Sequence, residues 1–382
     1  MRSTKWLLPA LALIALLAIP ASGQAKTVKV KPGQSIQAAI DAARPGDKIQ
    51  VQPGTYTETS KPCPAEPANS CAVVITKDRI TLQGKNATLQ ADGDQDVGIQ
   101  VGKTDDGAGC VGGDPSLNVS GSTIKGFTVR DFADDGLLLF CVEDFTVSQV
   151  SAIDNVEYGI FPSHTVGGRV HHSFTSGSND TGFYTGQSQD VRVDHNTATG
   201  NVSGFEIENS TNVMADHNLA TGNTGGILVF TLPFLDVKVG QDNIVRQNTV
   251  IDNDKPNSCV DPGDSVCQVP RGTGILILAA DGTLVDSNTV KDNDSYGIAV
   301  SNICVGQQLP PAICGILDIQ PDADNTHTIH NTVTGNGTNP DPNLPSVFAV
   351  DLAWDTTGTG NCWSSNVFNT EFPPGLQENN PC

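Results

Sequence analysis

The chain has 382 residues, with 42 acidic and 21 basic side chains, and its formal net charge is −21 at pH 7. A surface this acidic repels nucleic acid, so the composition excludes a nucleic-acid-binding protein. It also repels a polyanionic substrate, unless a local basic cluster or a divalent cation such as Ca²⁺ compensates.

Residues 1–23 have the layout of a secretory signal peptide. Arg2 and Lys5 precede an apolar run over residues 6–19, and small residues follow at 21–23. The run is too short to span a bilayer comfortably and no second one follows, so we expect no membrane span. Removal of Arg2 and Lys5 with this segment takes the net charge from −21 to −23. We expect a secreted or periplasmic protein of the cell envelope.

Ten cysteines in an exported chain favour disulfides over a metal site. Three pairs bracket short segments rich in Pro, Gly or Asp and predict local bridges, namely Cys63–Cys71, Cys259–Cys267 and Cys304–Cys314. The four remaining cysteines are paired as Cys110 with Cys141 and Cys362 with Cys382 only because the other six already have partners. No Cys-x-x-Cys spacing occurs and only two methionines are present, which argues against a zinc site and a thioether copper site.

Residues 24–60 read as an N-terminal cap and a first coil. The stretch 34–43 has apolar residues on one face and Ser35 in the N-cap position, which predicts a short helix. A turn and a strand follow it. We expect the helix to cover the open end of a stack of strands, where uncapped backbone and core would otherwise be exposed.

Residues 61–353 carry an internal repeat. A glycine followed by an alternating apolar strand recurs every 22 or 23 residues, with one step of 48 residues where 254–271 is inserted. The repeat glycines are Gly136, Gly159, Gly182, Gly204, Gly226, Gly274 and Gly297. A single unit of this kind cannot bury its apolar side, whereas stacked units bury a continuous core. We therefore predict an all-β solenoid, a single-stranded parallel β-helix of roughly ten coils.

Two columns of asparagine run in register with the glycines. The first column is Asn196, Asn218, Asn248, Asn288 and Asn331, and the second is Asn201, Asn223, Asn253, Asn293 and Asn336. Asparagine repeated at one point of every coil can hydrogen-bond to the coils above and below, which predicts a ladder. The second column lies in Gly-Asn or Asp-Asn turns that tolerate a left-handed backbone. After the repeats, we expect residues 354–382, with Trp354, Cys362, Trp363 and Cys382, to form an irregular C-terminal cap.

The opening VKPGQSIQAAIDAARPGDKIQVQPGTYTE and repeats such as VDHNTATGNVSGFEIENST and VDSNTVKDNDSYGIAV resemble the pectin-lyase-like superfamily of right-handed parallel β-helices. GFYTGQSQDVRV and GGILVFTLP are similar to exported bacterial β-helix repeat proteins of unassigned activity. The resemblance implies a right-handed β-helix over nearly the whole mature chain. The superfamily includes pectate and pectin lyases, polygalacturonases, mannuronan epimerases and non-catalytic periplasmic accessory proteins, so it does not choose an activity.

Glu206 and Glu208 form the first candidate site. If the first and third residues after each repeat glycine face the core, the second and fourth face outward, and these two acids share one face. Their Cα atoms then lie about 6.5 to 7 Å apart, with Tyr184 on the neighbouring coil to one side and Leu228 and Phe230 on the other. Such a pair can act as general acid and base on a glycosidic bond, or hold a calcium ion. It can equally be two solvated glutamates, and the loop 232–239 is a candidate cover.

Tyr158 and His164 form a second candidate. The sequence Tyr-Gly-Ile-Phe-Pro-Ser-His over 158–164 resembles the mannuronan-epimerase motif Tyr-Gly-Phe-Asp-Pro-His, in which Tyr and His donate and accept the proton. Here Phe161 replaces the Asp, and Ser163 displaces His164 by one position, which turns a side chain to the other face of a regular strand.

Three further groups of polar residues are candidates for site roles. Arg169 or Arg192 can accept a sugar carboxylate, or can pair at the surface with Asp190 and Asp194. Asp180 is a turn residue or an acid near Tyr184. His172, His195 and His217 form a column whose members can share a metal, but Gln247 and Ser287 continue it, so we assign no metal.

Two functions remain open from the sequence. The first is a monomeric extracytoplasmic β-helix that binds, and can modify by lyase, epimerase or hydrolase chemistry, a polysaccharide or other glycan. The second is a non-catalytic scaffold or accessory protein of the cell envelope. The residues do not decide whether the chain is an enzyme, and Ca²⁺ is the one cofactor that they suggest.

Overall fold

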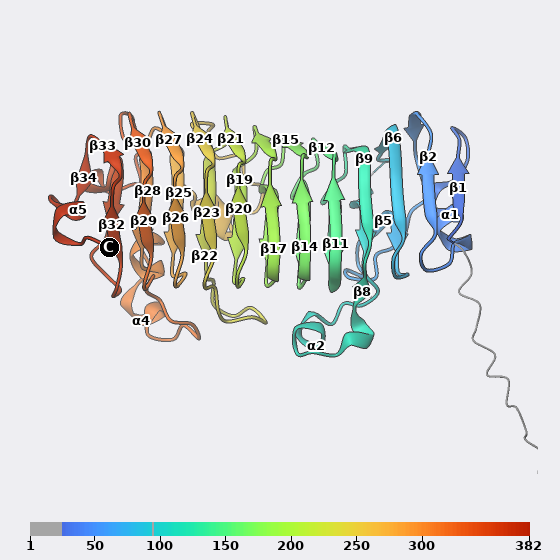
Figure 1. The fold of residues 1–382 in the computed structure, drawn as a ribbon, viewed down its shortest axis with the longest axis horizontal. Coiled ribbons are helices and arrows are strands. Elements are labelled where there is room, and N and C mark those ends of the chain that lie inside the picture. The colour runs from blue at the N-terminus through green and yellow to red at the C-terminus, as the bar shows by residue number, and fades with distance from the viewer. Residues whose placement is uncertain (1–24, 94) are drawn as a thin grey trace, which may run out of the picture.

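The computed structural model describes residues 25–93 and 95–382. The predicted signal peptide lies outside them. The described chain winds into stacked coils that follow one another in sequence order along the long axis (Figure 1), which confirms the predicted right-handed parallel β-helix. Within the described residues, no helix has the length and apolar character that crossing a membrane requires.

One side of the β-helix is a 12-stranded sheet. Its strands are β4 (Lys61–Pro62), β5 (Ser70–Ile75), β7 (Val97–Val101), β10 (Leu137–Phe140), β13 (Ile160–Ser163), β16 (Thr181–Gly186), β19 (Ser203–Glu208), β22 (Gly225–Phe230), β25 (Thr273–Leu278), β28 (Tyr296–Ser301), β31 (Leu352–Trp354) and β34 (Glu371–Phe372). Only β4 pairs in antiparallel fashion, with β5. The other strands each mark one coil, close to the predicted number.

The other two sides belong to a 22-stranded sheet. One row consists of β11 (Val142–Ser148), β14 (Val166–His171), β17 (Gln189–Asp194), β20 (Met214–Asp216), β23 (Ile244–Arg246), β26 (Leu284–Asp286), β29 (His327–Ile329) and β32 (Cys362–Ser364). The second row consists of β12 (Ser151–Ile153), β15 (Phe174–Ser176), β18 (Thr197–Thr199), β21 (Leu219–Thr221), β24 (Thr249–Ile251), β27 (Thr289–Lys291), β30 (Thr332–Thr334) and β33 (Val367–Phe368). At the N-terminal end lie β1 (Thr27–Val30), β2 (Lys48–Val51), β3 (Gly54–Tyr56), β6 (Thr81–Gln90), β8 (Val119–Ser120) and β9 (Thr123–Arg130).

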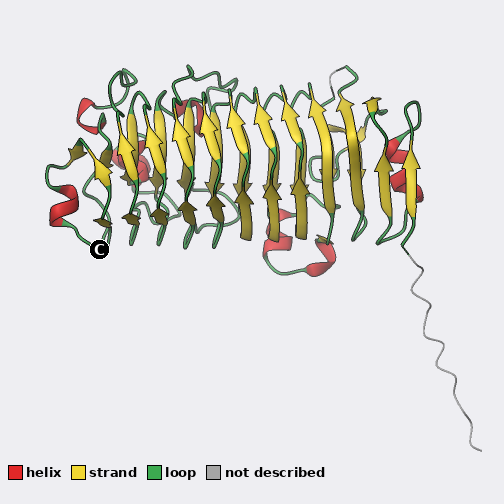
Figure 2. Ribbon diagram, turned by 45° about the horizontal axis from the view of Figure 1, so that its top comes forward, coloured by secondary structure: helices red, strands yellow, loops and turns green. Residues whose placement is uncertain are grey.

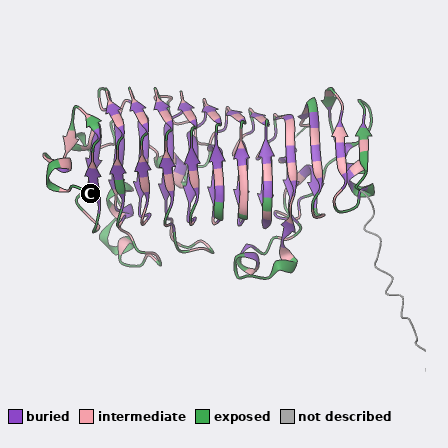
Figure 3. Ribbon diagram, in the orientation of Figure 1, coloured by how far each residue is buried: buried purple, intermediate pink, exposed green. Residues whose placement is uncertain are grey.

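The repeat glycines allow the coils to stack closely. A Cβ atom built on Gly226 would lie 2.6 Å from the carbonyl oxygen of Gly274, and one on Gly204 would lie 2.7 Å from that of Gly226. Any side chain there would therefore collide with the next coil. The first residue after each repeat glycine enters the main core, and in most coils the third does too, as Phe205 and Ile207 show. Figure 3 shows buried and intermediate residues alternating along the strands of the stack.

Both predicted asparagine columns form ladders. In the first, Asn218 Nδ2 donates to Asn248 Oδ1 over 3.1 Å, and in the second, Asn223 Nδ2 donates to Asn253 Oδ1 over 2.9 Å. The left-handed residue of each turn is not the asparagine but the residue before it, such as His217 with a φ of 56° and Gly222 with a φ of 67°. The buried amide then lies inside the bend and satisfies backbone groups of two coils.

The two ends of the stack are closed differently. Helix α1 (Ile36–Ala42) begins after Ser35, which accepts a hydrogen bond from the Ala38 amide, and buries Ile36 and Ile40 in the core. At the other end, the coil expected to be irregular after residue 353 instead continues both sheets through β32, β33 and β34. The short helix α5 (Leu376–Asn379) then closes the stack with buried Leu376. Trp363 is fully buried and occupies a core position, which explains why this coil keeps the register.

The five disulfides lie in loops or at loop boundaries, and their pairing agrees with the prediction, including the two leftover pairs Cys110–Cys141 and Cys362–Cys382. The remaining helices lie at the periphery of the stack (Figure 2) and are α2 (Gly107–Val111), α3 (Ile303–Gly306), α4 (Pro311–Cys314), and the 3₁₀ turns η1 (Pro115–Leu117), η2 (Ser265–Gln268) and η3 (Ser346–Phe348).

Candidate functional site

The outward face of the 12-stranded sheet carries the predicted columns in register. Tyr184 is paired with Glu206, and Glu206 with Leu228, while Glu208 is paired with Phe230. The second and fourth residues after each glycine thus stack from coil to coil on this face. Parallel in-register pairing follows from the nearly constant repeat length, because each coil begins at the same point of the stack.

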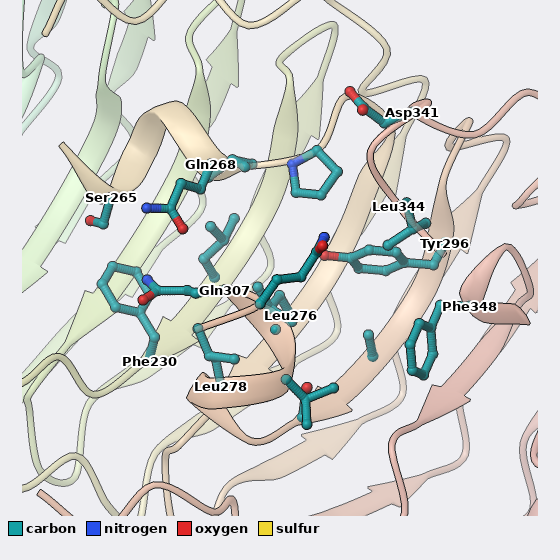
Figure 4. A pocket seen from close by; sticks show the side chains of 18 of the residues that line it. Phe230, Ser265, Gln268, Leu276, Leu278, Tyr296, Gln307, Asp341, Leu344 and Phe348 are labelled. Atoms are coloured by element: carbon teal, nitrogen blue, oxygen red, sulfur yellow. The ribbon is translucent and has the colours of Figure 1, made fainter. Parts of the chain in front are cut away.

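A pocket of about 650 Å³ lies on this face, over β22, β25, β28 and β31. Its floor includes Leu228, Phe230, Leu276 and Leu278, and Glu206 lines it as well. Three loops contribute its walls, namely 254–271, 302–321 and 337–349. Figure 4 shows Tyr296 and Phe348 beside this apolar floor, with the side chains of Gln268, Gln307 and Asp341 around it. Volumes of this size accommodate small organic ligands or a few sugar rings.

Sequence reasoning did not identify Tyr296, Phe348, Gln268, Gln307 or Asp341 as site residues. The extra length of the insertion 254–271 and the Cys304–Cys314 pair were the available signals, since each marks a long loop next to the sheet. Which face those loops cover depends on how they fold back across several coils, and a repeat pattern does not contain that information.

Glu206 and Glu208 are 5% and 7% exposed, so the solvated alternative is wrong for both. Burial raises the pKa of Glu206 to about 7, against a lowering effect of the Ser203 and Thr181 hydroxyls. Burial likewise raises the pKa of Glu208 to about 7, although the hydroxyl of Tyr184 donates a hydrogen bond to its Oε2. Of these two carboxylates, Glu206 lines the pocket and Glu208 does not. Calcium binding by the pair stays a prediction.

Tyr158, Phe161, Tyr184 and Asp180 lie together beside the glutamates. The ring centroids of Tyr158 and Phe161 are 4.3 Å apart, and those of Phe161 and Tyr184 are 4.6 Å apart in an edge-to-face arrangement. Burial and the nearby Glu206 raise the pKa of Asp180 well above its ordinary value. Burial and like charge thus favour the protonated form of Asp180, and raised carboxyl pKa values are frequent at functional sites.

His164 lies at the opposite end of β13 from Tyr158, in a left-handed conformation with a φ of 54°. Its Nδ1 is hydrogen bonded to Ser163 Oγ over 2.8 Å, and its Nε2 lies 3.4 Å from Asp236. Burial lowers the pKa of His164, and Asp236 partly offsets this effect. His164 thus lies among the loop 232–239, Phe140 and Gly107 of α2, whereas Tyr158 belongs to the Asp180 cluster.

The loop 232–239 crosses the end of the sheet beyond β22, as expected for a cover. Asn209 Nδ2 donates to the carbonyl oxygens of Leu232 and Val237, over 2.8 and 2.7 Å. The Val237 amide donates to Gln187 Oε1 over 3.1 Å. This loop therefore lies against Asn209, Gln187 and His164, and its first residue, Leu232, lines the pocket beside Glu206.

Arg169 and Arg192 lie in the 22-stranded sheet, on β14 and β17, and not beside the glutamates. Arg169 makes a two-point interaction with fully buried Asp194, and Arg192 makes one with Asp216. Hydrogen bonds from Arg169 and His195 help to hold the pKa of Asp194 near 2, against the effect of burial. Arg192 also lies 3.2 Å from Asp194, the partner expected from the sequence, so the surface-pairing alternative is the better description for both arginines.

His172, His195 and His217 stack in the same sheet. Their rings are parallel within 4°, with centroids 5.0 and 4.9 Å apart. Nδ1 of His195 and His217 faces Asp194 and Asp216, at 2.7 and 3.0 Å. Because ring-nitrogen lone pairs lie in the ring planes, parallel stacked rings direct them side by side and not toward one shared ion. The histidine column thus extends the network of arginine and aspartate pairs, because His195 and His217 contact the same two aspartates.

Solved structures with a similar fold act on polysaccharides according to their titles. The A-module of the mannuronan C-5 epimerase AlgE6 from Azotobacter vinelandii matches with a TM-score of 0.58 and 16% identity, over 89% of this chain and 94% of that one. The periplasmic alginate epimerase AlgG matches with a TM-score of 0.56 and 14% identity, over 90% and 73%. A family 28 exopolygalacturonase from Yersinia enterocolitica matches with a TM-score of 0.54 and 10% identity, over 91% and 76%.

At these identities the likeness shows the fold alone. No curated protein sequence matches the chain significantly. A family model described as periplasmic copper-binding protein (NosD) matches residues 115–367, which is well over half of the chain and includes the pocket floor, the glutamate pair and both asparagine ladders. This match agrees with the resemblance to exported β-helix repeat proteins that the sequence shows. The chain therefore belongs to the NosD family.

Proposed function

We propose that this periplasmic or secreted β-helix binds a carbohydrate polymer along its 12-stranded sheet, with the β22–β31 pocket as the main binding site. The observation that carries this proposal is Glu206, a buried carboxyl group with a pKa near 7 that lines an open pocket with aromatic and amide side chains. Aromatic rings such as Phe230 and Tyr296 can stack on sugar rings. The amides of Gln268 and Gln307 can hydrogen-bond to sugar hydroxyls, and polysaccharide-acting proteins share the fold.

Glu206 can also supply chemistry. A carboxyl group with a pKa near the working pH can either give or take a proton, which is the requirement for a general acid or base. Glu208 is held by Tyr184 and lies outside the pocket lining, so it positions and charges the site rather than touching a ligand in the pocket. The reaction class, whether lyase, epimerase or hydrolase, is then a matter for product analysis.

A non-catalytic role is the second candidate, and one observation favours it. Tyr158 and His164, the residues that resemble an epimerase motif, lie at opposite ends of β13, and His164 is buried under the loop 232–239. A protein that has lost this pair can still bind a polymer or a partner in the apolar pocket. It would then act as an accessory protein of the cell envelope.

The family description names copper, but the described residues do not gather the soft thiolate and thioether ligands that Cu⁺ prefers. All ten cysteines are consumed by disulfides. Met214 is the one methionine among the described residues. Met214 is thus the single soft ligand for Cu⁺ among the described residues, and the three stacked histidines do not converge on one point.

The test is a screen of the purified protein against uronic-acid and neutral polysaccharides. Binding, unsaturated products, reducing ends and changes in sugar configuration would each be measured. We expect binding to at least one polymer, reduced by about tenfold in Phe230→Ala through loss of ring contact. Glu206→Gln should abolish any turnover, while Glu378→Gln, at an exposed position near the C-terminus, should behave as wild type. Binding without turnover in the wild type would select the accessory role, and no binding to any polymer would refute the proposal.

A further inference from the structure

Three carboxylates meet at the edge where the strands of the 12-stranded sheet begin, far from the pocket. Glu66 comes from the loop between β4 and β5, and Asp134 and Asp135 come from the turn before β10. One oxygen of each lies within 4.8 Å of those of the other two. Asp135 is only 1% exposed, whereas Glu66 and Asp134 are half-buried. The site is therefore closed at its base and open toward solvent.

The charged groups that face this cluster are acidic. Asp134, Glu66 and Glu157 surround Asp135, and Asp96 adds to the negative charge around Asp134. Like charges at this separation repel strongly unless protons or a cation neutralise them.

A second observation points to a missing ligand. The backbone amide of Tyr158 faces the Asp135 carboxyl group, but Oδ1 of Asp135 is buried and has no hydrogen-bond partner among the described residues. A buried carboxylate oxygen without a partner is costly, and native structures usually satisfy such a group with water or an ion. Asn69 Nδ2 donates to Glu66 Oε2 over 3.0 Å and to Asp134 Oδ2 over 2.8 Å, which fixes these two acids in place.

We propose that Glu66, Asp134 and Asp135 bind a calcium ion. Calcium–oxygen distances are about 2.4 Å, so oxygens up to about 4.8 Å apart can contact one ion. The ligands are all carboxylate oxygens, which hard cations prefer, and a cage of several protein carboxylates suits Ca²⁺ better than Mg²⁺, which keeps most of its water. Glu157 and water can complete the coordination from the open side.

The ion would join two parts of the chain that the backbone does not connect closely. Glu66 belongs to the loop held by Cys63–Cys71, while Asp135 precedes Gly136, whose amide donates to the carbonyl oxygen of Tyr158 over 2.9 Å. Calcium would thus fasten the loop 63–71 to the edge of the sheet beside the Tyr158 cluster. This role does not depend on which ligand the pocket takes.

The experiment is calorimetric titration of the EDTA-treated protein with CaCl₂ near neutral pH, together with thermal unfolding in EDTA and in Ca²⁺. We expect one site in the wild type and a higher unfolding temperature in Ca²⁺. Asp135→Asn should weaken Ca²⁺ binding by about tenfold or more. Asp264→Asn is the matched control, because Asp264 is exposed, makes no side-chain cap bond and lies in a distant loop.

A second readout separates a ligand from a merely structural aspartate. Without Ca²⁺, Asp135→Asn removes repulsion, so we expect it to unfold at the same or a higher temperature than wild type in EDTA. With Ca²⁺, the order should reverse. The proposal fails if the wild type shows no calorimetric Ca²⁺ binding, or if Asp135→Asn binds Ca²⁺ as tightly as wild type. MgCl₂ should bind more weakly, and tighter Mg²⁺ binding would overturn the choice of ion.

Discussion

The hydroxyl of Tyr184 on β16 donates a hydrogen bond to Oε2 of Glu208 on the next strand, β19. The bond is diagonal, because Tyr184 is paired with Glu206 and Glu208 is paired with Gly186. A Cβ atom at position 186 would overlap the Tyr184 ring, so Gly186 provides the space for this contact. Gly186 thus leaves room for the Tyr184 ring to lie beside Glu208, which accepts its hydrogen bond.

Removal of this hydroxyl should raise the pKa of Glu208. The hydrogen bond from Tyr184 lowers that pKa, whereas burial raises it to about 7. In Tyr184→Phe only the raising effect remains, so the carboxyl group should titrate at a higher pH than in wild type, as measured by NMR of ¹³C-labelled glutamate. We expect a loss of stability of about 1 kcal/mol. An unchanged titration of Glu208 would mean that the hydrogen bond does not form in solution.

Stability should fall as the pH rises through neutrality. Burial raises the pKa of both Glu206 and Glu208 from 4.5 to about 7 in the folded protein. Between these values the folded state binds more protons than the unfolded state, so the stabilising contribution is complete below about pH 4.5 and is lost as the pH approaches and passes 7. Each unit of raised pKa corresponds to about 1.4 kcal/mol, which is an upper bound for a coupled pair.

The measurement is the unfolding temperature in EDTA across this pH range. We expect the decline with pH to be smaller in the double variant Glu206→Gln, Glu208→Gln than in wild type, because amides do not titrate. Glu378→Gln, on the exposed surface, should keep the wild-type slope. Equal slopes in the double variant and the wild type would show that these glutamates titrate near their ordinary pKa in the folded protein.

Loss of an asparagine side chain from the middle of a ladder should lower the free energy of unfolding more than loss of the exposed side chain before it. Asn248 accepts from the Asn218 amide and donates to the carbonyl oxygen of Ala215 and to Asn288 Oδ1. Asn248→Ala leaves these buried groups without partners, which should cost about 2 to 4 kcal/mol in the free energy of unfolding. Gln247→Ala, at the exposed adjacent position, should cost less than about 0.5 kcal/mol. Denaturant unfolding compares the two, and similar losses would contradict the ladder.

The repeat pattern predicted much of the fold and part of the site. It gave the coil length, the inward and outward columns, the asparagine ladders and the placement of Tyr184, Glu206 and Phe230 on one face, while the Ser35 N-cap and the apolar face of residues 34–43 gave the α1 cap. These features are local or nearest-neighbour properties, since each coil contacts mainly the coil before and after it. The final coil was not predicted, because Trp363 takes the core position that the two preceding coils fill with Val285 and Thr328.

The sequence by itself determined the ladder and which side chains share a face, because a nearly constant repeat converts position along the chain directly into position on a surface. The tertiary structure decided what each face meets. It brought the loops 302–321 and 337–349 over the sheet, where they form a pocket at Glu206. It also buried His164 under the loop 232–239 and paired Arg169 with Asp194. It also joined Glu66 to Asp135 across the sheet edge. These contacts depend on how irregular loops fold back across several coils, and no period in the sequence encodes that path.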